Sequence, residues 1–516
     1  MADEETQTEQ PSAFERLLNI FTDVKAGEGL TAVLLLLNVL LLLTSYYVIK
    51  PVRDALITGM PGGEGDTYKA YMSGATAVAL LLAVPAYASF AKKLPRNRLV
   101  VGATLFFVSN IVLFAFGTKI PGSGEWLPLV FYLWVGVFNM MVVAQFWAFA
   151  NDIYSEEQGE RLFPLVGIGA SFGAVVGGGL AKFLPIRPQS NLEGGCNAVT
   201  KQVGYLDTFS MLLLSGAILL VCAALTQWVH KRESKSKPRK KIKSQLQETM
   251  AASADEMKEA VAKLEEKISK DAEKEKKSDE SGEGTGEAGA FTMVWRYRYL
   301  ILLAAFSLLF TFANTNGEFM ISNLVKKHVF STVGQCEFAD EATKDAFVSG
   351  MFTSWYGDFY LYVNILGVLL QSFAVSRVVK WGGVKVALFV FPVVALFGAT
   401  AVLLFPVLSV LRPAKIAENA TDYSFNNTVR NMLWLPTTKA MKYQAKQAVD
   451  TFFVRMGDVS SALMVFFIVD LMAVEDIRIF AGTNLLVLAG LIAVAAAILR
   501  EQKNIKAMKE RGELPE

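Results

Sequence analysis

The stretch "VLLLLNVLLLLTSYYVIKPVRDALITG", residues 33–59, decides the fold of this chain. Its apolar part, which begins near Leu30, is long enough to cross a bilayer core, a distance that takes about 20 helical residues. A membrane helix normally ends in a polar loop at such a point. Here the chain runs into Lys50, Arg53 and Asp54 and then turns apolar again. These charges are either an anchor at the membrane edge or part of a binding site.

The composition identifies a polytopic all-α membrane protein. The chain has 516 residues, of which 53% are hydrophobic and 19% charged, and apolar runs of membrane-spanning length recur along it. We expect clear spans at 30–49, 70–91, 99–117, 126–150, 162–184, 206–229, 298–318, 350–374, 384–410, 448–471 and 478–499. A more polar candidate for a further span lies at 422–438.

Basic residues indicate the orientation of the spans. They follow the second, sixth, eighth and last spans, which the positive-inside rule places in the cytoplasm. These four sites share one side of the membrane only if 422–438 also crosses. We therefore predict twelve transmembrane helices with both termini in the cytoplasm, and we expect the protein in the cell inner membrane. The predicted parts are a tail (1–29), a six-helix bundle (30–230), a charged cytoplasmic linker (231–290), a second six-helix bundle (291–500) and a tail (501–516). The basic run at 231–243 is expected to contact anionic lipid.

The two halves show weak internal similarity, as expected for a transporter built from two parallel repeats. Aligning "LLLTSYYVIKPV" with "LLFTFANTNGEF" superposes Thr44 on Thr311, and a second short match superposes Gly169 on Gly457. Within the first half, Gly169, Gly173 and Gly177 recur at every fourth residue, a spacing that favours close helix packing.

Charged and polar residues inside spans are candidates for function because an unpaired charge in the bilayer is costly. Tyr46, Lys50 and Arg53 share one face if the first helix continues past Ile49. In "ANTNGEFM", 313–320, the polar residues beside a glycine predict either a functional bend or a purely structural break of the seventh span. One interpretation is an ion pair between Glu318 and Lys50 that closes the outer gate.

Two other polar groups lie near the expected cytoplasmic side. The acidic loop "FANDIYSEEQGERLFPL", 149–165, either forms a gate, pairs with basic residues or contacts a ligand. In 426–458, solvated loop cations explain Lys439 and Lys442, but they explain Arg430, Lys446 and Arg455 less well.

The sequence predicts transport rather than catalysis. It contains no G-x-x-x-x-G-K-[ST] phosphate loop, and His230 and His328 lie far apart with no Cys/His cluster. We therefore expect no enzyme activity, metal or cofactor. Cys196 and Cys336 fall in loops expected outside, where an oxidising compartment permits a bridge. Such a bridge would restrain the outer gate, which argues mildly against it.

Several segments resemble the ATP/ADP translocases of plastids and obligate intracellular bacteria. They are "YYVIKPVRDALI", "FANDIYSEEQGERLFPLVGIGAS", "NGEFMISNLVKK" and, most specifically, "LWLPTTKAMKYQAKQAVDTFFVRMGD". The resemblance implies a fold related to the major facilitators and exchange of one nucleotide for another by alternating access, without hydrolysis. It also implies functional roles for Arg53–Asp54, Glu318, and Lys446 with Asp450 and Arg455.

A nucleotide's phosphates require several cations in a low-dielectric cavity. Lys50, Arg53, Arg430 and Lys446 are candidates for this role, with Arg53 favoured over Lys50, and Tyr46, Tyr47 or Trp147 are candidates to stack on the base. The full set of predicted binding or gating residues is Tyr46, Lys50, Arg53, Asp54, Asn151, Asp152, Asn314, Glu318, Arg430, Lys446, Asp450 and Arg455.

Two alternatives remain open at this point. One is a transporter of another organic anion, coupled to protons through Glu318 or Asp450; the other is a receptor whose output is the segment 231–290. In either case we expect a monomer in the lipid bilayer that does not bind nucleic acid.

Overall fold

The computed structural model describes most of the chain. The described residues are 27–91, 96–154, 156–188, 202–250, 287–334, 341–438 and 445–511, with 15, 18, 19, 22, 24, 25, 336, 338, 441 and 513. Lys439 and Lys442, and most of the predicted linker, lie outside this set.

The described part is almost entirely helical, because its long apolar runs satisfy their backbone hydrogen bonds internally only as helices. The helices of the first half are α2 (Gly29–Thr58), α3 (Gly65–Ala91), α4 (Arg96–Gly117), α5 (Leu127–Ile153), α6 (Glu156–Phe183) and α7 (Thr208–Met250), with a short 3-10 turn at Ser123–Glu125. Two short strands, β1 (Arg187–Pro188) and β2 (Gln202–Val203), pair antiparallel between α6 and α7.

The helices of the second half are α9 (Glu287–Arg296), α10 (Arg298–Val333), α11 (Glu341–Leu369), α12 (Ser376–Leu404), α13 (Leu408–Thr421), α14 (Asn427–Met432), α15 (Lys446–Ala448), α16 (Val454–Val465) and α17 (Ile477–Glu510). Four π-helical segments join some of them, at Leu370–Val375, Asp422–Asn426, Val449–Phe453 and Phe466–Leu471.

Within the described residues, nine helical segments are long and apolar enough to cross a membrane. The longest, Thr343–Leu404, has 62 residues, about twice what a single crossing needs. It changes direction at Gly383, whose φ of 67° lies in the left-handed region that glycine adopts readily. The chain is therefore an integral, multi-pass membrane protein.

Two details of the expected spans are corrected. The helical stretch expected at 422–438 begins earlier, at Leu408, and continues through the π-helical segment to Met432. The expected break at 313–320 is absent, since α10 is helical throughout these residues. The polar side chains there make contacts with other helices instead: Asn316, for example, donates to Asn484 Oδ1 at 2.7 Å.

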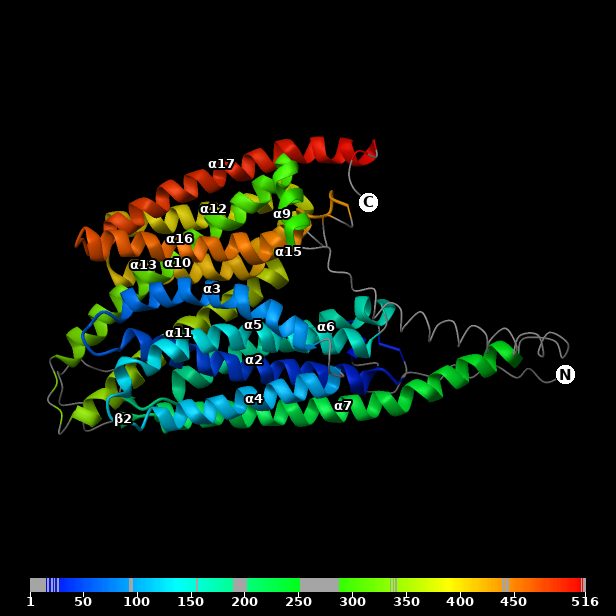
Figure 1. Cartoon of the computed structure of the whole chain (residues 1–516), viewed down its shortest axis with the longest axis horizontal. Helices are drawn as coiled ribbons and strands as arrows, with labels where there is room; N and C mark the ends of the chain where they lie inside the picture. The colour runs from blue at the N-terminus through cyan, green and yellow to red at the C-terminus, as the bar shows by residue number, and fades with distance from the viewer. Residues whose placement is uncertain are drawn as a thin grey trace.

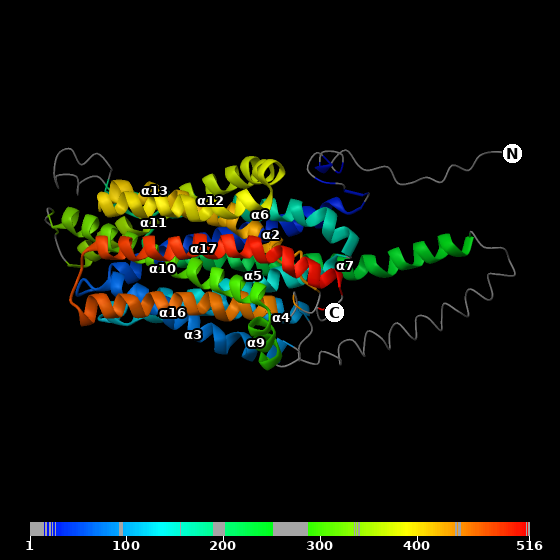
Figure 2. The same ribbon diagram turned by 90° about the horizontal axis from the view of Figure 1, so that it is seen from above.

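The first helix does continue past Ile49, the condition for Tyr46, Lys50 and Arg53 to share a face, because α2 extends to Thr58 with Pro51 inside it. At the other boundary of the first half, α7 continues as one helix through the basic segment 231–243. Figure 2 shows α7 extending beyond the other helices of the bundle.

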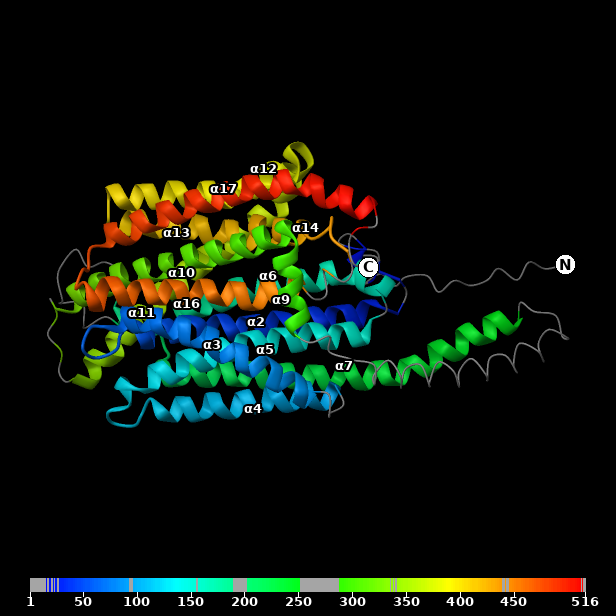
Figure 3. The ribbon, with the colours of Figure 1, turned by 45° about the horizontal axis from the view of Figure 1, so that its top comes forward.

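The ends of the bundle are named here for the helices that finish there. The terminal end is where α2 begins and α17 ends, and the distal end is the opposite one, where α2 ends and α17 begins (Figures 1 and 3). Two helices make most of the contacts between the halves of the chain: α3 packs against α16 and α10, while α11 packs against α6 and α2. In Figure 1, α3 accordingly lies beside helices of the second half.

The buried apolar residues show how the halves meet. The largest cluster contains residues of both halves in their distal part, including Val52 of α2, Phe319 of α10 and Phe352 of α11. Towards the terminal end each half has a cluster of its own, one around Phe146 and Leu162 and the other around α12 and α17. Among the residues that the structure describes, the halves thus share a core only in their distal part.

Glycines permit the closest helix contacts, as the sequence pattern predicted for α6. A Cβ on Gly173 would overlap the carbonyl oxygen of Leu40 in α2. In the second half, a Cβ on Gly457 would lie 2.6 Å from the carbonyl oxygen of Leu308 in α10. In each half, therefore, a glycine permits close contact between the two helices: α6 with α2 in the first half and α16 with α10 in the second.

The cysteines differ in state. Cys222 is free and buried in α7, whereas Cys336, after the end of α10, is disulfide-bonded. Cys196 lies outside the described residues. The sequence argument against a bridge is therefore wrong for Cys336, and a disulfide agrees with the oxidising side on which that argument placed it.

The packing of α6 on α2 gives a first prediction. Gly173→Ala should lower the thermal unfolding midpoint in detergent, because overpacking a tight contact costs about 1–3 kcal/mol. Gly179→Ala is the matched control on the same helix, since a Cβ there meets no atom within 4 Å. Equal midpoints for the two variants would contradict the close approach.

Candidate functional site

Charged side chains gather where the halves meet, in the distal part of the bundle. Asp54 of α2 is fully buried and accepts two hydrogen bonds at Oδ1, from Arg53 Nε at 3.0 Å and Arg53 Nη2 at 2.7 Å. Its other oxygen accepts a hydrogen bond from the hydroxyl of Tyr360 in α11 at 2.7 Å. One carboxylate therefore connects the first half of the chain to the second.

Lys69 of α3 links an acid of each half. Its Nζ lies 3.7 Å from Asp54 Oδ1 and 3.7 Å from Glu318 Oε2 of α10, and it donates to Ser322 Oγ at 3.0 Å. Only 5% of this side chain is exposed. A charge this deeply buried is tolerated because carboxylates and a hydroxyl replace its hydration.

A second buried lysine extends the cluster within the second half. Lys415 of α13 has no exposed side-chain surface and donates to Asn314 Oδ1 at 2.8 Å and to Glu418 Oε1 at 2.7 Å. Glu318 in turn accepts a hydrogen bond from Asn419 at 3.2 Å. We call the set of three cations and three carboxylates the interface charge network; it consists of Arg53, Asp54, Lys69, Glu318, Lys415 and Glu418.

Two further contacts join the halves near the same end. Lys326 of α10 pairs with Asp66 of α3, which also accepts from Asn323 at 2.7 Å. Asp358 of α11 lies 2.5 Å from Lys182 Nζ of α6 and also pairs with Arg412 of α13. Charge pairing and the shared apolar core thus close the same part of the bundle.

Lys50 differs from these cations. Its Nζ lies 4.0 Å from the ring centre of Tyr360, 5.6 Å from that of Tyr47 and 3.4 Å from the Tyr423 hydroxyl oxygen. Among the described residues, no carboxylate oxygen lies within 4.0 Å of it, whereas Glu318 pairs with Lys69. The expected Glu318–Lys50 ion pair is therefore wrong, because α3 brings a closer cation to Glu318.

The remaining predicted residues of the second half lie apart from this network. Arg430 pairs with Asp450 at 2.9 Å, and Lys446 donates to Asn431 Oδ1 at 2.9 Å, both towards the terminal end. Arg455 instead pairs with Asp458 at 3.1 Å, and Thr315 also donates to Asp458.

The predicted aromatic residues are packed rather than open. Tyr46 and Tyr47 are buried and meet edge to face, with ring centres 5.1 Å apart. Trp147 packs on Phe146 and Phe163 in the terminal part of the first half.

The acidic segment expected to be a loop is instead mostly helical, because α5 extends to Ile153 and α6 begins at Glu156. Its side chains form a local cluster of the first half at the terminal end. Asn151 and Asp152 are exposed there, at the end of α5. Glu28 contacts Arg161 at 3.1 Å and accepts from Gln158 at 2.8 Å. Burial alone would raise the pKa of the Glu28 carboxyl, but the hydrogen bonds from Arg161 and Gln158 outweigh it and hold that pKa below its ordinary value.

Sequence reasoning missed Lys69, Lys415 and Glu418. Lys69 falls just outside the expected second span, and Lys415 and Glu418 fall between the expected ninth and tenth spans, where charged residues are ordinary. The available signal was the moderate polarity of 408–432, which suits a helix facing other helices rather than lipid.

The arrangement defines a class of protein. By fold, the chain is similar to a solved POT family transporter in complex with 5-aminolevulinic acid (TM-score 0.53, 13% identity, 92% of this chain and 96% of that one). It is also similar to the solved nucleoside transporter NupG (TM-score 0.53, 11% identity, 90% of this chain and 98% of that one). Its helices thus have the arrangement of a membrane transporter.

The sequence comparisons give the family. Residues 119–504 match the TLC ATP/ADP transporter family, and the chain belongs to it. ADP,ATP carrier protein 5 of Rickettsia conorii is 21% identical over 364 residues, 66% of this chain and 62% of that protein. ADP,ATP carrier protein 1 of Chlamydia pneumoniae is 20% identical over 470 residues, 81% of each chain. The resemblance expected from the sequence is confirmed: the chain is a transporter and not an enzyme.

The buried position of Lys69 gives a second prediction. Lys69→Met should lower the stability of the folded protein by about 3–5 kcal/mol, because it leaves two carboxylates short of a buried cation. Thermal unfolding in detergent measures this. Lys119→Met is the control, since the exposed pair of Lys119 with Asp207 is worth at most about 1 kcal/mol. Similar midpoints for both variants would exclude a structural role for the network.

Proposed function

We propose that the chain exchanges nucleotides across the membrane by alternating access, without hydrolysis. Family membership supports the substrate class, since the similar proteins from Rickettsia and Chlamydia are named as ADP,ATP carriers. The observation that carries the mechanism is the asymmetry of the bundle. Its halves share a core and the interface charge network in the distal part but have separate cores towards the terminal end.

The membrane arrangement follows from the same proposal. Twelve crossings result if α3 and the stretch 408–432 also cross and Gly383 separates two spans. They form two bundles of six, and the terminal end faces the cytoplasm because the described basic residues in the later part of α7, at the start of α12 and in the last turns of α17 lie there. The bundle is then closed towards the outside, with its nucleotide entry at the cytoplasmic end of an inner membrane.

Lys50 is the first contact that we assign to the nucleotide phosphates. It is partly exposed and lies one helical turn nearer the terminal end than Asp54. Its ammonium group contacts tyrosine rings and a hydroxyl, which are uncharged and do not neutralise it. Lys50 can therefore still pair with an anion. Arg53, favoured from the sequence alone, is occupied by Asp54 and belongs to the closure instead. Arg430 and Lys446 are positioned to meet a nucleotide nearer the entry.

Exchange follows from the balance of charge. With no substrate, three cations and three carboxylates offset one another and keep the distal part closed. A bound polyanion competes with Asp54 and Glu318 for the cations and so favours separation of the distal ends. A ligand shifts a conformational equilibrium only by binding one state more tightly than the other. Without a bound polyanion nothing offsets the network, so the empty carrier does not readily open its distal end. Glu318 and Asp450 are both ion-paired, which gives no support to proton coupling through them.

Obligate exchange is tested in proteoliposomes. Uptake of labelled ADP should be fast into vesicles loaded with ATP or ADP and slow into empty ones. Equal uptake into both kinds of vesicle would exclude exchange, and no uptake into either would exclude the nucleotide as substrate.

The role of Lys50 is tested with the same assay. Lys50→Gln should lower the exchange rate roughly 10- to 100-fold, the equivalent of a lost charge-assisted hydrogen bond. Lys25→Gln is the control because Lys25 is exposed and forms a surface ion pair with Glu157. A Lys50→Gln rate equal to that of the control would return Lys50 to the role of a membrane-edge anchor.

A further inference from the structure

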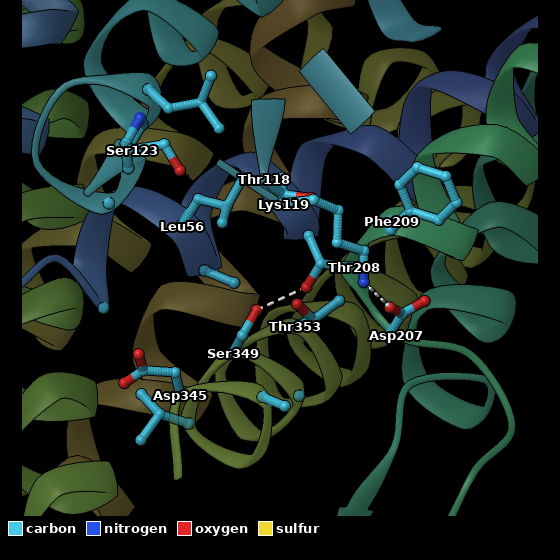
Figure 4. Close-up of a pocket in the computed structure, with 18 of the residues that line it drawn as sticks. Leu56, Thr118, Lys119, Ser123, Asp207, Thr208, Phe209, Asp345, Ser349 and Thr353 are labelled. Carbon is cyan, nitrogen blue, oxygen red and sulfur yellow. Dashed lines mark hydrogen bonds and ion pairs between the residues drawn. The ribbon is translucent and has the colours of Figure 1, made fainter. Parts of the chain in front are cut away.

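A cavity of about 570 Å³ lies at the distal end, beside the interface charge network. Five segments line it: the end of α2, the α4–α5 connection, Pro185 and Ile186 after α6, the start of α7 and the start of α11 (Figure 4). Its volume lies within the range of small-molecule sites. No step of the proposed exchange uses it.

The wall of the cavity is mainly apolar, formed by Leu56, Met60, Ile120, Leu127, Leu206 and Phe209 among others. A pocket of this size and polarity binds small molecules with an apolar body, held in place by a few polar groups. The cavity is therefore unsuited to the highly charged phosphates of a nucleotide.

The charged groups of the lining determine which sign of charge a ligand of the cavity should carry. Lys119 is offset by Asp207, with Nζ and Oδ2 2.9 Å apart. Asp345 of α11 is exposed, and among the described residues no lysine or arginine nitrogen lies within 4.0 Å of its carboxylate. Since Lys119 contributes +1 and the two aspartates −1 each, the lining carries a formal charge of −1.

We propose that this cavity binds lipophilic amines, with the alkyl part against the apolar wall and the ammonium group at Asp345. Charge complementarity selects amines over fatty acids and other amphiphilic anions. The cavity therefore selects cationic ligands, whereas the proposed nucleotide pathway selects anionic ones.

Occupancy has a consequence for transport, and this part rests on the proposed alternating access. The cavity is lined by both halves, and the hydroxyls of Thr208 in α7 and Ser349 in α11 are hydrogen-bonded at 2.7 Å across the junction (Figure 4). Separation of the distal ends would dismantle the cavity. A bound amine therefore stabilises the closed form and slows exchange without occupying the nucleotide site.

Binding is measured on the purified full-length protein by thermal shift with octylamine, using octanol and octanoate as matched probes. Octylamine should raise the unfolding midpoint at the lowest concentration. Asp345→Asn should weaken this effect roughly two- to fivefold, as expected for an exposed ion pair, and Ala346→Trp should remove it by filling the cavity. Glu341→Gln, an exposed acid one turn away that is not part of the lining, should bind as the wild type.

Equal stabilisation by octanoate, or unchanged binding in Asp345→Asn, would overturn the site. In proteoliposomes, octylamine should lower the maximal exchange rate of the wild type with no change in apparent KM, and less so for Asp345→Asn. Inhibition that excess nucleotide reverses, or binding without inhibition, would overturn the coupling to closure. If the wild type exchanges no nucleotide at all, the proposed function fails, and the thermal-shift comparison still decides the site.

Discussion

The structure depends on one shared cation. Lys69 lies 3.7 Å from a carboxylate of each half, Asp54 and Glu318; Lys69 and Asp54 are almost completely buried, and Glu318 is partly exposed. Buried ion pairs often add little net stability, because desolvation offsets their attraction, yet removing one partner is strongly destabilising. Such a network specifies which surfaces of the halves meet while leaving their association weak enough to reverse. A carrier whose closed end must open in every transport cycle requires an association that is both specific and reversible.

The rest of the architecture is consistent with that closure. The apolar core is shared only where the network lies, and each half keeps its own core towards the terminal end. The π-helical segments of the second half also carry polar residues that contact cations of the proposed pathway: Tyr423 contacts Lys50, and Asp450 pairs with Arg430. Single π-helical turns are uncommon in helices and concentrate at functional sites.

The sequence predicted the spans well because hydrophobicity over about 20 residues is a local property. It also identified Arg53, Asp54, Asn314 and Glu318, which the structure brings to one region. It failed where the neighbour belongs to another helix. Lys69 and Lys415 fell outside the expected spans because a hydropathy window ends at charged residues. Glu318 was paired with Lys50 on the basis of the internal symmetry of the two halves. That symmetry does not show that α3 packs against α10 and brings Lys69 close to Glu318. A single sequence does not encode these contacts as a visible pattern.

The central claim is that the interface charge network holds the distal ends together. The most direct test is the distance distribution between spin labels at Glu125 of the first half and Lys327 of the second, both exposed near the distal end. Without nucleotide, the otherwise unmodified protein should give one narrow, short population, and Lys69→Met should add a longer one while the protein remains folded and monodisperse. An unchanged distribution in Lys69→Met would show that apolar packing alone closes this end, and would contradict the account.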